Sequence, residues 1–474
     1  MTTLSLGILA LGALVFIHVL LRDLEYIGGF YFTAAFAWIQ AAAFLVCESI
    51  GLERSRFFCP QAFEATCLSL VGVIVLVLGF RLGVGRDSMM RRSNRSMESL
   101  ARFRPLLLFQ IWLAGLVIWT LVGSVGAFGG LRNILASFAV LRFAPLVLLF
   151  ARAHVFKEKQ LLALAALAVE VALGASGFFS GFKGPLFLSL VTVLSFSGRT
   201  GTRAVVARLV VGVALLGSMV TWQAVKEDYR SFQSDGSGTQ AVVQSRDQSL
   251  GYLARQIGEL EVADLVQGSS SGLQRLAYVE FFGLAIRMVP SRIPHTNGEL
   301  WTNAVMNPLR PRILFPDKGV YDDSALTNQF TGAAVAGSGE GTSISMGWMA
   351  EAYIDFGRFG MFVPIFLVGL ALGAALRSLT RSLANPWITS ALSTCLFVLQ
   401  PLQLEVAAAK QTGSLVMSLI LIWGIQFALK GVVRHGPGAP RKLGWTGVMP
   451  RRVNGPAAQR KSSKGQQPQG PMVS

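Results

Sequence analysis

Long apolar runs, separated by short basic loops, fill most of this 474-residue chain. Each run is long enough, or nearly so, to cross a hydrocarbon layer of roughly 30 Å. The pattern predicts an all-α fold, a polytopic integral membrane helical bundle with about eleven transmembrane helices. The runs lie near residues 4–21, 27–50, 66–82, 105–124, 134–151, 160–180, 184–197, 203–222, 360–377, 386–404 and 413–433.

One long polar stretch interrupts the runs and divides the chain. We predict N-terminal membrane helices over 1–222, a large loop over 223–359, C-terminal membrane helices over 360–433, and a disordered basic tail over 434–474. Apolar residues recur at helical spacing from Leu273 to Met288 inside the loop, which predicts a short helix there. Residues 343–356 predict another helix, with Glu351 and Asp355 one turn apart on one face.

Composition excludes several classes of protein. With 52% hydrophobic and 14% charged residues, the chain is too apolar for a soluble protein of this length. Its net charge of +17 lies largely in short loops and in the tail, so membrane topology accounts for it and we expect no nucleic-acid partner. The same loops predict an external N-terminus, a cytoplasmic C-terminus and an external 223–359 loop.

The cysteines and histidines have no spacing typical of a metal site. We therefore expect no metal and no cofactor. A disulfide between Cys59 and Cys67, or between Cys47 and Cys59, stays open if that loop faces an oxidising compartment, but unlinked thiols are favoured.

Arg142 and Glu170 fall near the middle of apolar runs. An ionised group there costs roughly 2.5 to 3.5 kcal/mol, so each is expected to face a partner or a wet cavity. The two residues form either an intramembrane polar pair that joins two helices or part of a site. In SGFFSGFKGPLF, Lys183 sits among small residues, which suits either a phosphate or an ordinary helix connection at the headgroup level.

The external stretch 287–318 carries the strongest chemical signal. Its cations gain nothing from membrane topology, and guanidinium groups match phosphate oxygens bidentately. We predict phosphate recognition by the cations of this stretch and by Lys183; lipid headgroups or nearby acids are the alternative partners. His295 is the first candidate for a general base, because its pKa is ordinarily near neutral. A surface or hydrogen-bonding role for His295 is the alternative.

The order of these features resembles the oligosaccharide repeat-unit polymerases, the Wzy-type O-antigen polymerases. The resemblance covers roughly residues 100–430. It rests on SGFFSGFKGPLF, WQAVKEDYR (222–230), NPLRPRILFPDKG (307–319) and GWMAEAYIDFGRFGMFVPIFLVGLALG (347–373). Lys183 stands where that family often has arginine, and Asp355 where asparagine is frequent.

The resemblance implies a metal-independent glycosyltransferase of the bacterial inner membrane, which polymerises undecaprenyl-diphosphate-linked oligosaccharides on the external face. By matching position, the resemblance assigns diphosphate binding to Arg292, Arg310, Arg312 and Lys318. It makes His295 the first choice of base, with Glu299, Glu340 and Glu351 as the further candidates. It also implies a flippase and a chain-length regulator as partners, besides membrane lipid. Three alternatives stay open, and one of them is a purely structural or regulatory membrane protein. An O-antigen ligase uses the same donor with another acceptor. A transporter or flippase for a lipid-linked glycan would place charges near the midplane in both halves of the chain.

Overall fold

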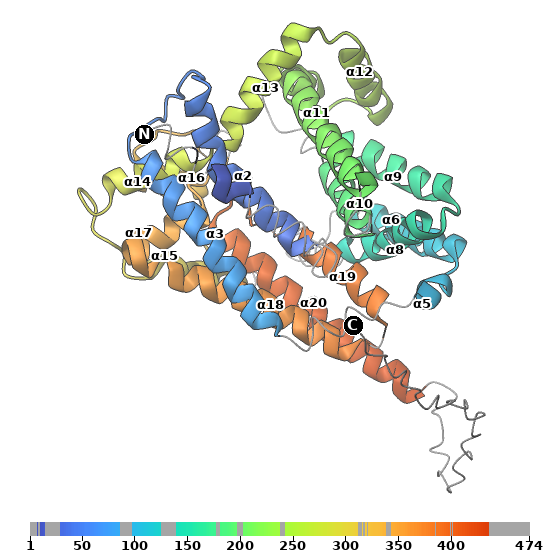
Figure 1. Cartoon of the computed structure of the whole chain (residues 1–474). Helices are drawn as coiled ribbons and strands as arrows, with labels where there is room; N and C mark the ends of the chain where they lie inside the picture. The colour runs from blue at the N-terminus through green and yellow to red at the C-terminus, as the bar shows by residue number, and fades with distance from the viewer. Residues whose placement is uncertain are drawn as a thin grey trace, which may run out of the picture. The chain divides into compact units, whose positions relative to one another are not determined.

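The protein structure is a computed structural model. It describes residues 7, 10–14, 29–85, 97–124, 139–176, 181–196, 202–237, 242–310, 315, 318–319, 321–337, 343–383, 385–398, 400 and 402–435. The chain divides into a compact unit, Met1–Phe427, and a second unit, Ala428–Ser474. In the second unit the described part is the end of one helix, up to His435. Within the described ranges every regular element is a helix, as predicted (Figure 1).

The helices of the first half include most of the apolar runs. They are α2 (Gly29–Ser49), α3 (Ala62–Val84), α5 (Met97–Ala101), α6 (Pro105–Ser124), the 3-10 helix η2 (Val140–Arg142), α8 (Phe143–Phe156), α9 (Gln160–Ala175), α10 (Lys183–Phe196) and α11 (Thr202–Gln233).

The second half begins with short helices and returns to long apolar ones. They are α12 (Arg246–Gly258), α13 (Val262–Leu276), α14 (Val279–Met288), α15 (Glu299–Leu309), α16 (Asp323–Thr331), α17 (Trp348–Gly360), α18 (Phe362–Ser382), α19 (Pro386–Val398) and α20 (Ala408–His435).

Four helices of the described chain are long and apolar enough to cross a membrane: α2, α3, α18 and the Ala408–Phe427 part of α20. Four shorter apolar helices lie at Pro105–Leu121, Gln160–Ala175, Lys183–Ser195 and Pro386–Val398. At 1.5 Å per residue, these stretches of 13 to 17 residues fall short of roughly 30 Å of hydrocarbon, although α6 as a whole has 20 residues. The predicted count of about eleven spans is therefore not supported, and the run at 4–21 lies almost wholly outside the described residues.

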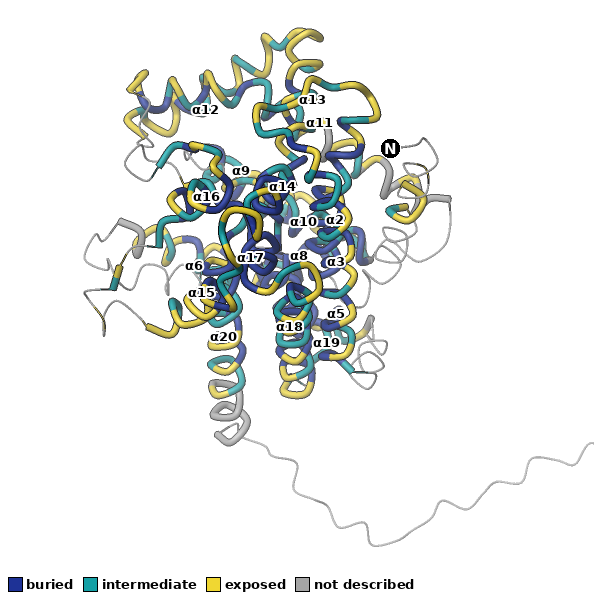
Figure 2. The backbone as a smooth tube through the Cα atoms, turned by 90° about the vertical axis from the view of Figure 1, so that its left-hand side faces the viewer, coloured by how far each residue is buried: buried dark blue, intermediate teal, exposed yellow. Residues whose placement is uncertain are grey.

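Exposed apolar side chains show that this is a membrane protein. Leu106, Leu107, Ile118 and Leu121 of α6 are each about half exposed or more, and Trp423 and Phe427 of α20 are more exposed still. Soluble proteins rarely expose so much contiguous apolar surface. Buried positions gather instead where α3, α14 and α17 meet (Figure 2).

Glycines bring α3 and α18 into backbone contact. A Cβ added at Gly79 or Gly83 would lie 2.3 or 2.4 Å from the carbonyl oxygens of Phe366 and Leu370. On the facing helix, a Cβ at Gly373 would lie 2.2 Å from the carbonyl oxygen of Phe80. Small residues one turn apart allow such close approach between membrane helices, where dispersion supplies much of the association energy. These two helices lie side by side in Figure 1.

The predicted helix from Leu273 to Met288 is wrong in one respect, because the chain breaks at its centre. The helix α13 ends at Leu276, and α14 begins at Val279. The Tyr278 hydroxyl at the break donates a 2.6 Å hydrogen bond to the Ser345 carbonyl. The predicted helix over 343–356 is present as α17, which begins at Trp348.

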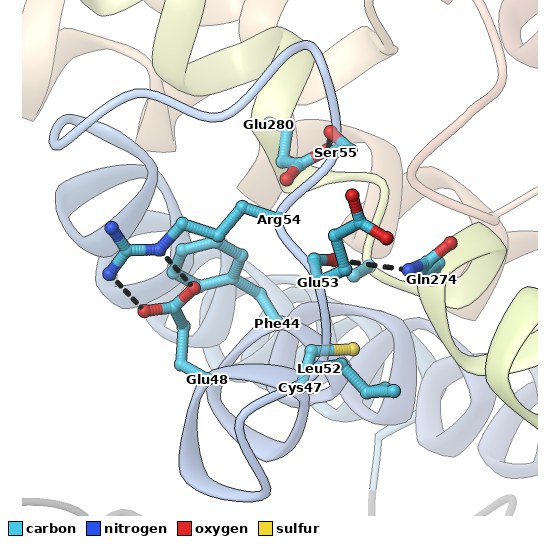
Figure 3. A pocket seen from close by; sticks show the side chains of 10 residues that line it. Phe44, Cys47, Glu48, Leu52, Glu53, Arg54, Ser55, Gln274 and Glu280 are labelled. Carbon is cyan, nitrogen blue, oxygen red and sulfur yellow. Dashed lines mark hydrogen bonds and ion pairs between the residues drawn. The ribbon is translucent and has the colours of Figure 1, made fainter.

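The turn after α2 is tied to α13 and α14 (Figure 3). Arg54 pairs with Glu48 through two hydrogen bonds of 2.9 and 3.1 Å. Gln274 of α13 donates to the Glu53 carbonyl at 3.0 Å, and the Ser55 hydroxyl bonds to Glu280 of α14. These contacts fix the last turn of α13 against α2. All four cysteines are unlinked, as favoured from the sequence.

Candidate functional site

The turn between α19 and α20, residues 402–407, packs onto the first turn of α17. Gly347 precedes α17 with φ +98°, and a Cβ there would lie 1.9 Å from the Leu404 carbonyl oxygen. Only glycine permits this backbone and this approach. The Trp348 amide then donates a 2.7 Å hydrogen bond to the Val406 carbonyl. The turn is thereby held beside Glu351, one helical turn further on.

Glu351 is buried and both of its carboxyl oxygens are engaged. One accepts a 3.2 Å hydrogen bond from the Ala408 amide, and the other a 3.2 Å bond from the Tyr321 hydroxyl. Burial, which penalises the charged form, raises the pKa of Glu351 to about 8. Burial and the adjacent Glu351 also raise the pKa of Tyr321. A carboxyl group with a near-neutral pKa is typical of functional sites, although the same signal arises in structural networks.

Two more buried carboxylates lie in the same region. Asp323 accepts hydrogen bonds from the Lys410 ammonium and, at 2.6 Å, from the Ser343 hydroxyl, while its Oδ1 atom has no partner. Asp355 accepts from the amides of Leu300 and Trp301 at 3.1 and 2.7 Å, and from the Thr296 hydroxyl. The Asp355 carboxylate therefore caps the N-terminus of α15, where the helix dipole is positive, and so has a structural role.

Glu405 is half-buried in the 402–407 turn and is held by the transmembrane helix α2. Gln40, buried in α2, donates from Nε2 to Glu405 Oε2 at 3.3 Å. The Gln40 side-chain oxygen accepts a 3.0 Å bond from the Leu404 amide. One amide group thus fixes both the backbone of the turn and one oxygen of its carboxylate.

Four cations on three helices lie within electrostatic range of one another, and we call them the cationic group: Lys183, Lys226, Arg230 and Arg275. Lys183 begins α10 and lies 5.9 Å from the ring centre of Trp222. Lys226 and Arg230 are one turn apart on α11, beyond the apolar run that ends at 222. Arg275 is in the last turn of α13. Glycines on α13 allow it to approach α11 closely, since a Cβ at Gly268 would lie 2.8 Å from the Val220 carbonyl oxygen.

The cations depress one another's pKa values. Burial first, then the charges of Arg275, Arg230 and Lys183, lowers the pKa of Lys226 to about 8. Desolvation and the field of Arg275 lower the pKa of Lys183, while Glu405 acts in the opposite direction. Lys183, Lys226 and Arg275 form no ion pair with a carboxylate within the described part of the chain. Repulsion among these cations destabilises the protein without an anion and favours the binding of one.

Electrostatic interactions of Glu405 and Tyr278 link the cationic group to the carboxylates. The Tyr278 pKa is raised by burial and then by Glu405, whereas Arg275 lowers it and Asp323 raises it. Tyr278 therefore lies within electrostatic range of both Arg275 and Asp323. The candidate site consists of the cationic group, Glu405 and the buried carboxyl groups behind it. No group of three or more metal-binding side chains is present among the residues that the structure describes.

The stretch 287–318, predicted from the sequence to bind the diphosphate, is described in part by the structure. His295 is half-buried, and its Nδ1 lies 3.0 Å from the Ile354 carbonyl oxygen. Because a carbonyl only accepts, Nδ1 carries the proton and Nε2 stays available as a base. Glu299 and Arg292 are exposed on either side of it, and Arg310 is exposed at the end of α15.

Lys318 caps the C-terminal end of α15. Its ammonium donates to the carbonyl of Asn307 and, at 3.0 Å, to that of Arg310. A cation at a helix C-terminus stabilises the helix dipole. The other two candidates, Arg312 and Glu340, lie outside the described residues. Diphosphate binding by Arg292, Arg310, Arg312 and Lys318 stays a prediction, as do the catalytic roles of His295 and Glu299.

The structure brings Arg142 and Glu170 together. Two 3.2 Å hydrogen bonds join the guanidinium group to the carboxylate, and Trp112 donates a third bond of 3.0 Å to Glu170. This contact joins η2, α9 and α6. The pair has the geometry of the structural alternative, since its groups satisfy one another.

Sequence reasoning missed Gln40, Glu405, Lys226 and Arg275 as site residues. Two signals were present: Gln40 interrupts the apolar run AFAWIQAAAF, and Glu405 lies between two apolar runs in PLQLEV. Lys226 and Arg230 fall within WQAVKEDYR, one of the strings that resemble Wzy-type polymerases. Nothing in the sequence shows that α13 crosses α11 closely enough to bring Arg275 to the other cations.

These observations define an all-helical membrane protein with a cationic and acidic site beside its apolar helices. Residues 26–379 match a family described as a domain of unknown function (DUF8712), and the chain belongs to that family. No curated protein and no solved structure matches the chain.

Proposed function

We propose that this protein is a membrane glycosyltransferase that polymerises undecaprenyl-diphosphate-linked oligosaccharide repeat units into a surface polysaccharide. The observation that carries the proposal is the cationic group. Lys183, Lys226 and Arg275 lie within electrostatic range of one another and form no ion pair with a carboxylate in the described chain. A diphosphate is an anion of matching charge, and its departure as a leaving group needs such cations.

The position of the cations favours a lipid-borne substrate. Lys183 stands at the first residue of the apolar helix α10, and Lys226 follows the apolar part of α11. Cations at the ends of apolar helices meet the headgroup region of a bilayer. A diphosphate whose lipid chain stays in the membrane would present its charge at that level.

The reaction proposed is a displacement at an anomeric carbon. A hydroxyl of one lipid-linked unit attacks that carbon in another, the bond from carbon to the diphosphate oxygen breaks, and lipid diphosphate leaves with the electron pair. The hydroxyl proton passes to a base, for which the sequence offers His295, Glu299 and Glu351. The resemblance to Wzy-type polymerases supports the same chemistry, with the reaction on the external face of the bacterial inner membrane.

Other features of the proposal follow from sequence and resemblance. They are the passage of the shorter apolar helices through the membrane in a bundle of about eleven spans, an external N-terminus, a cytoplasmic C-terminus, and a flippase and chain-length regulator nearby. Metal-independent chemistry belongs to the proposal as well.

The test uses the full chain in lipid nanodiscs with a lipid-diphosphate-linked oligosaccharide from the native host. We expect wild-type protein to lengthen the glycan and to release polyprenyl diphosphate. Lys226→Ala and Arg275→Ala each remove a charge-assisted contact of roughly 1.5 to 3 kcal/mol, so each should lower turnover by about tenfold to a hundredfold. Arg255→Ala, which removes an exposed cation of α12, is the matched control.

Three results would overturn the proposal. Transfer of the glycan only to a lipid A core would identify a ligase. Movement of an unchanged substrate between the two leaflets would identify a transporter. If the repeat units are left unaltered and the protein binds no polyprenyl diphosphate, lipid-diphosphate-linked glycans are excluded as substrates.

A further inference from the structure

Within the candidate site, Glu405 is the described carboxylate with an oxygen that is both unpartnered and open to solvent, whereas the unpartnered Oδ1 of Asp323 is enclosed. Glu351 has both oxygens engaged, and Asp355 caps α15 with both of its own. Asp323 is paired with Lys410. Glu405 accepts one hydrogen bond, from Gln40 to Oε2, and no residue of the described chain bonds to its Oε1. Oε1 is also absent from the fully enclosed unpartnered atoms, so solvent or a ligand reaches it.

The charge of Glu405 also acts on the cationic group, at Lys183, as that of the exposed Glu227 acts on its neighbour Lys226. Among the described residues, Glu405 is the acid that opposes the mutual repulsion at Lys183. Yet no ion pair joins Glu405 to a cation within the described chain. Glu405 therefore stands next to the region where a diphosphate would bind, without being neutralised by direct contact. A general base must reach the hydroxyl proton directly or through one water, and a carboxylate within electrostatic range of the diphosphate-binding cations meets the first condition for that role.

Gln40 is placed to orient this carboxylate. It is buried in α2, and its amide group bonds to both Glu405 Oε2 and the Leu404 amide. A polar side chain in an apolar transmembrane helix is costly unless it has such partners. The arrangement fixes Oε2 and leaves Oε1 without a hydrogen bond to the described chain.

We infer that Glu405 is the catalytic base of the proposed glycosyl transfer, and that Gln40 is its positioning residue. This inference rests on the proposed function. The acceptor hydroxyl oxygen forms a bond to the anomeric carbon of the donor, and the bond from that carbon to the diphosphate breaks. The hydroxyl proton moves to Glu405 Oε1, and the electron pair leaves on the diphosphate oxygen, which the cationic group receives. No oxidant, reductant or metal is needed to balance the step.

The deciding experiment measures turnover and binding separately in nanodiscs. Glu405→Gln keeps the shape and the Gln40 contact but accepts no proton. General bases contribute about 10² to 10⁴ in rate, so turnover should fall at least a hundredfold. Binding of a short-chain polyprenyl diphosphate, used as the probe, should stay within about twofold of wild type. In Glu405→Ala, added formate should restore part of the turnover, which a purely structural role would not allow.

Controls address folding, position and the competing base. Glu259→Gln changes an exposed carboxylate at the end of α12 and should behave as wild type. Gln40→Met should lower kcat about tenfold with little change in KM, because only the orientation of the base is lost. If Glu405→Gln does not reach the membrane, Glu405→Asp decides: we expect a loss of more than tenfold with binding kept, and wild-type turnover would overturn the inference.

The two proposals fail in different ways. If wild-type protein elongates the glycan and Lys226→Ala does not, while Glu405→Gln turns over normally, the proposed function stands and the role of Glu405 is wrong. Loss of turnover with intact binding in His295→Ala would then assign the base to His295. If wild-type protein neither elongates nor binds the lipid diphosphate, the proposed function itself falls.

Discussion

Arg142 and Glu170 join two helices through a double hydrogen bond, with both N–O distances at 3.2 Å. Glu170 is 3% exposed, so the pair is shielded from water. Trp112 adds a third donor, and the Arg142 guanidinium lies 4.3 Å from the ring centre of Phe143. Desolvation offsets much of the attraction in such a pair, but removal of one partner leaves an uncompensated charge.

Single and double substitutions of this pair should therefore differ. We expect Glu170→Gln or Arg142→Met alone to lower the free energy of unfolding by about 3 to 5 kcal/mol. The double variant should lose less than the sum, because neither charge is left alone. Thermal unfolding in detergent, followed by circular dichroism, measures both. Additive losses would show that the two charges do not depend on each other.

The contact between α3 and α18 gives a second prediction. Gly373→Leu would force a side chain into the Phe80 carbonyl, which a Cβ alone would approach to 2.2 Å. Backbone must then separate, and overpacking of this kind costs typically 1 to 3 kcal/mol or more. Gly424→Leu on α20 is the matched control, since nothing lies within 4 Å of a Cβ there. The yield of folded protein after mild heating should fall for Gly373→Leu and stay constant for Gly424→Leu; equal yields would contradict the packing argument.

Some of this structure follows directly from sequence pattern. Apolar runs of about twenty residues fold as helices because only a helix satisfies its own backbone in an apolar setting, so α2, α3 and α18 coincide with predicted runs. An unpaired charge at Glu170 or Arg142 would be costly in an apolar helix, so a contact between the two residues is predictable. The span count was less predictable, because a run of apolar residues does not show where its helix ends: α19 stops at Val398 and α10 has only 14 residues.

The candidate site depends on tertiary contacts that local pattern does not contain. Lys226 and Arg230 are neighbours by helical spacing, but Arg275 reaches them only because Gly268 and Gly272 let α13 lie close to α11. Gln40 and Glu405 are 365 positions apart in the chain. Charge density directed the sequence interpretation to residues 287–318, where Lys318 is engaged with the end of α15.

Asp355 offers a test of a structural role within the segment that resembles polymerases. Its carboxylate accepts from two amides at the start of α15 and from Thr296, and it is 1% exposed. Asp355→Ala should loosen α15, at a cost of about 1 to 2 kcal/mol for the lost cap. Hydrogen exchange measured by mass spectrometry should rise in the peptide that covers 299–309. Asp355→Asn keeps one acceptor and should show a smaller rise. Unchanged exchange in both variants would mean that the cap does not hold the helix.

The raised pKa of Glu351 predicts a pH-dependent stability with a definite sign. Burial raises the pKa from 4.5 to about 8, so the folded protein binds a proton that the unfolded chain releases between those values. The contribution is fully present below pH 4.5, is lost as the pH rises towards 8, and changes no further above that. Glu351→Gln cannot ionise, yet it keeps an oxygen for the Ala408 amide and a donor for the Tyr321 oxygen. In unfolding measured from pH 5 to pH 9, this variant should gain stability over wild type steadily up to about pH 8, and a difference that stays constant across that range would show that Glu351 is ionised throughout.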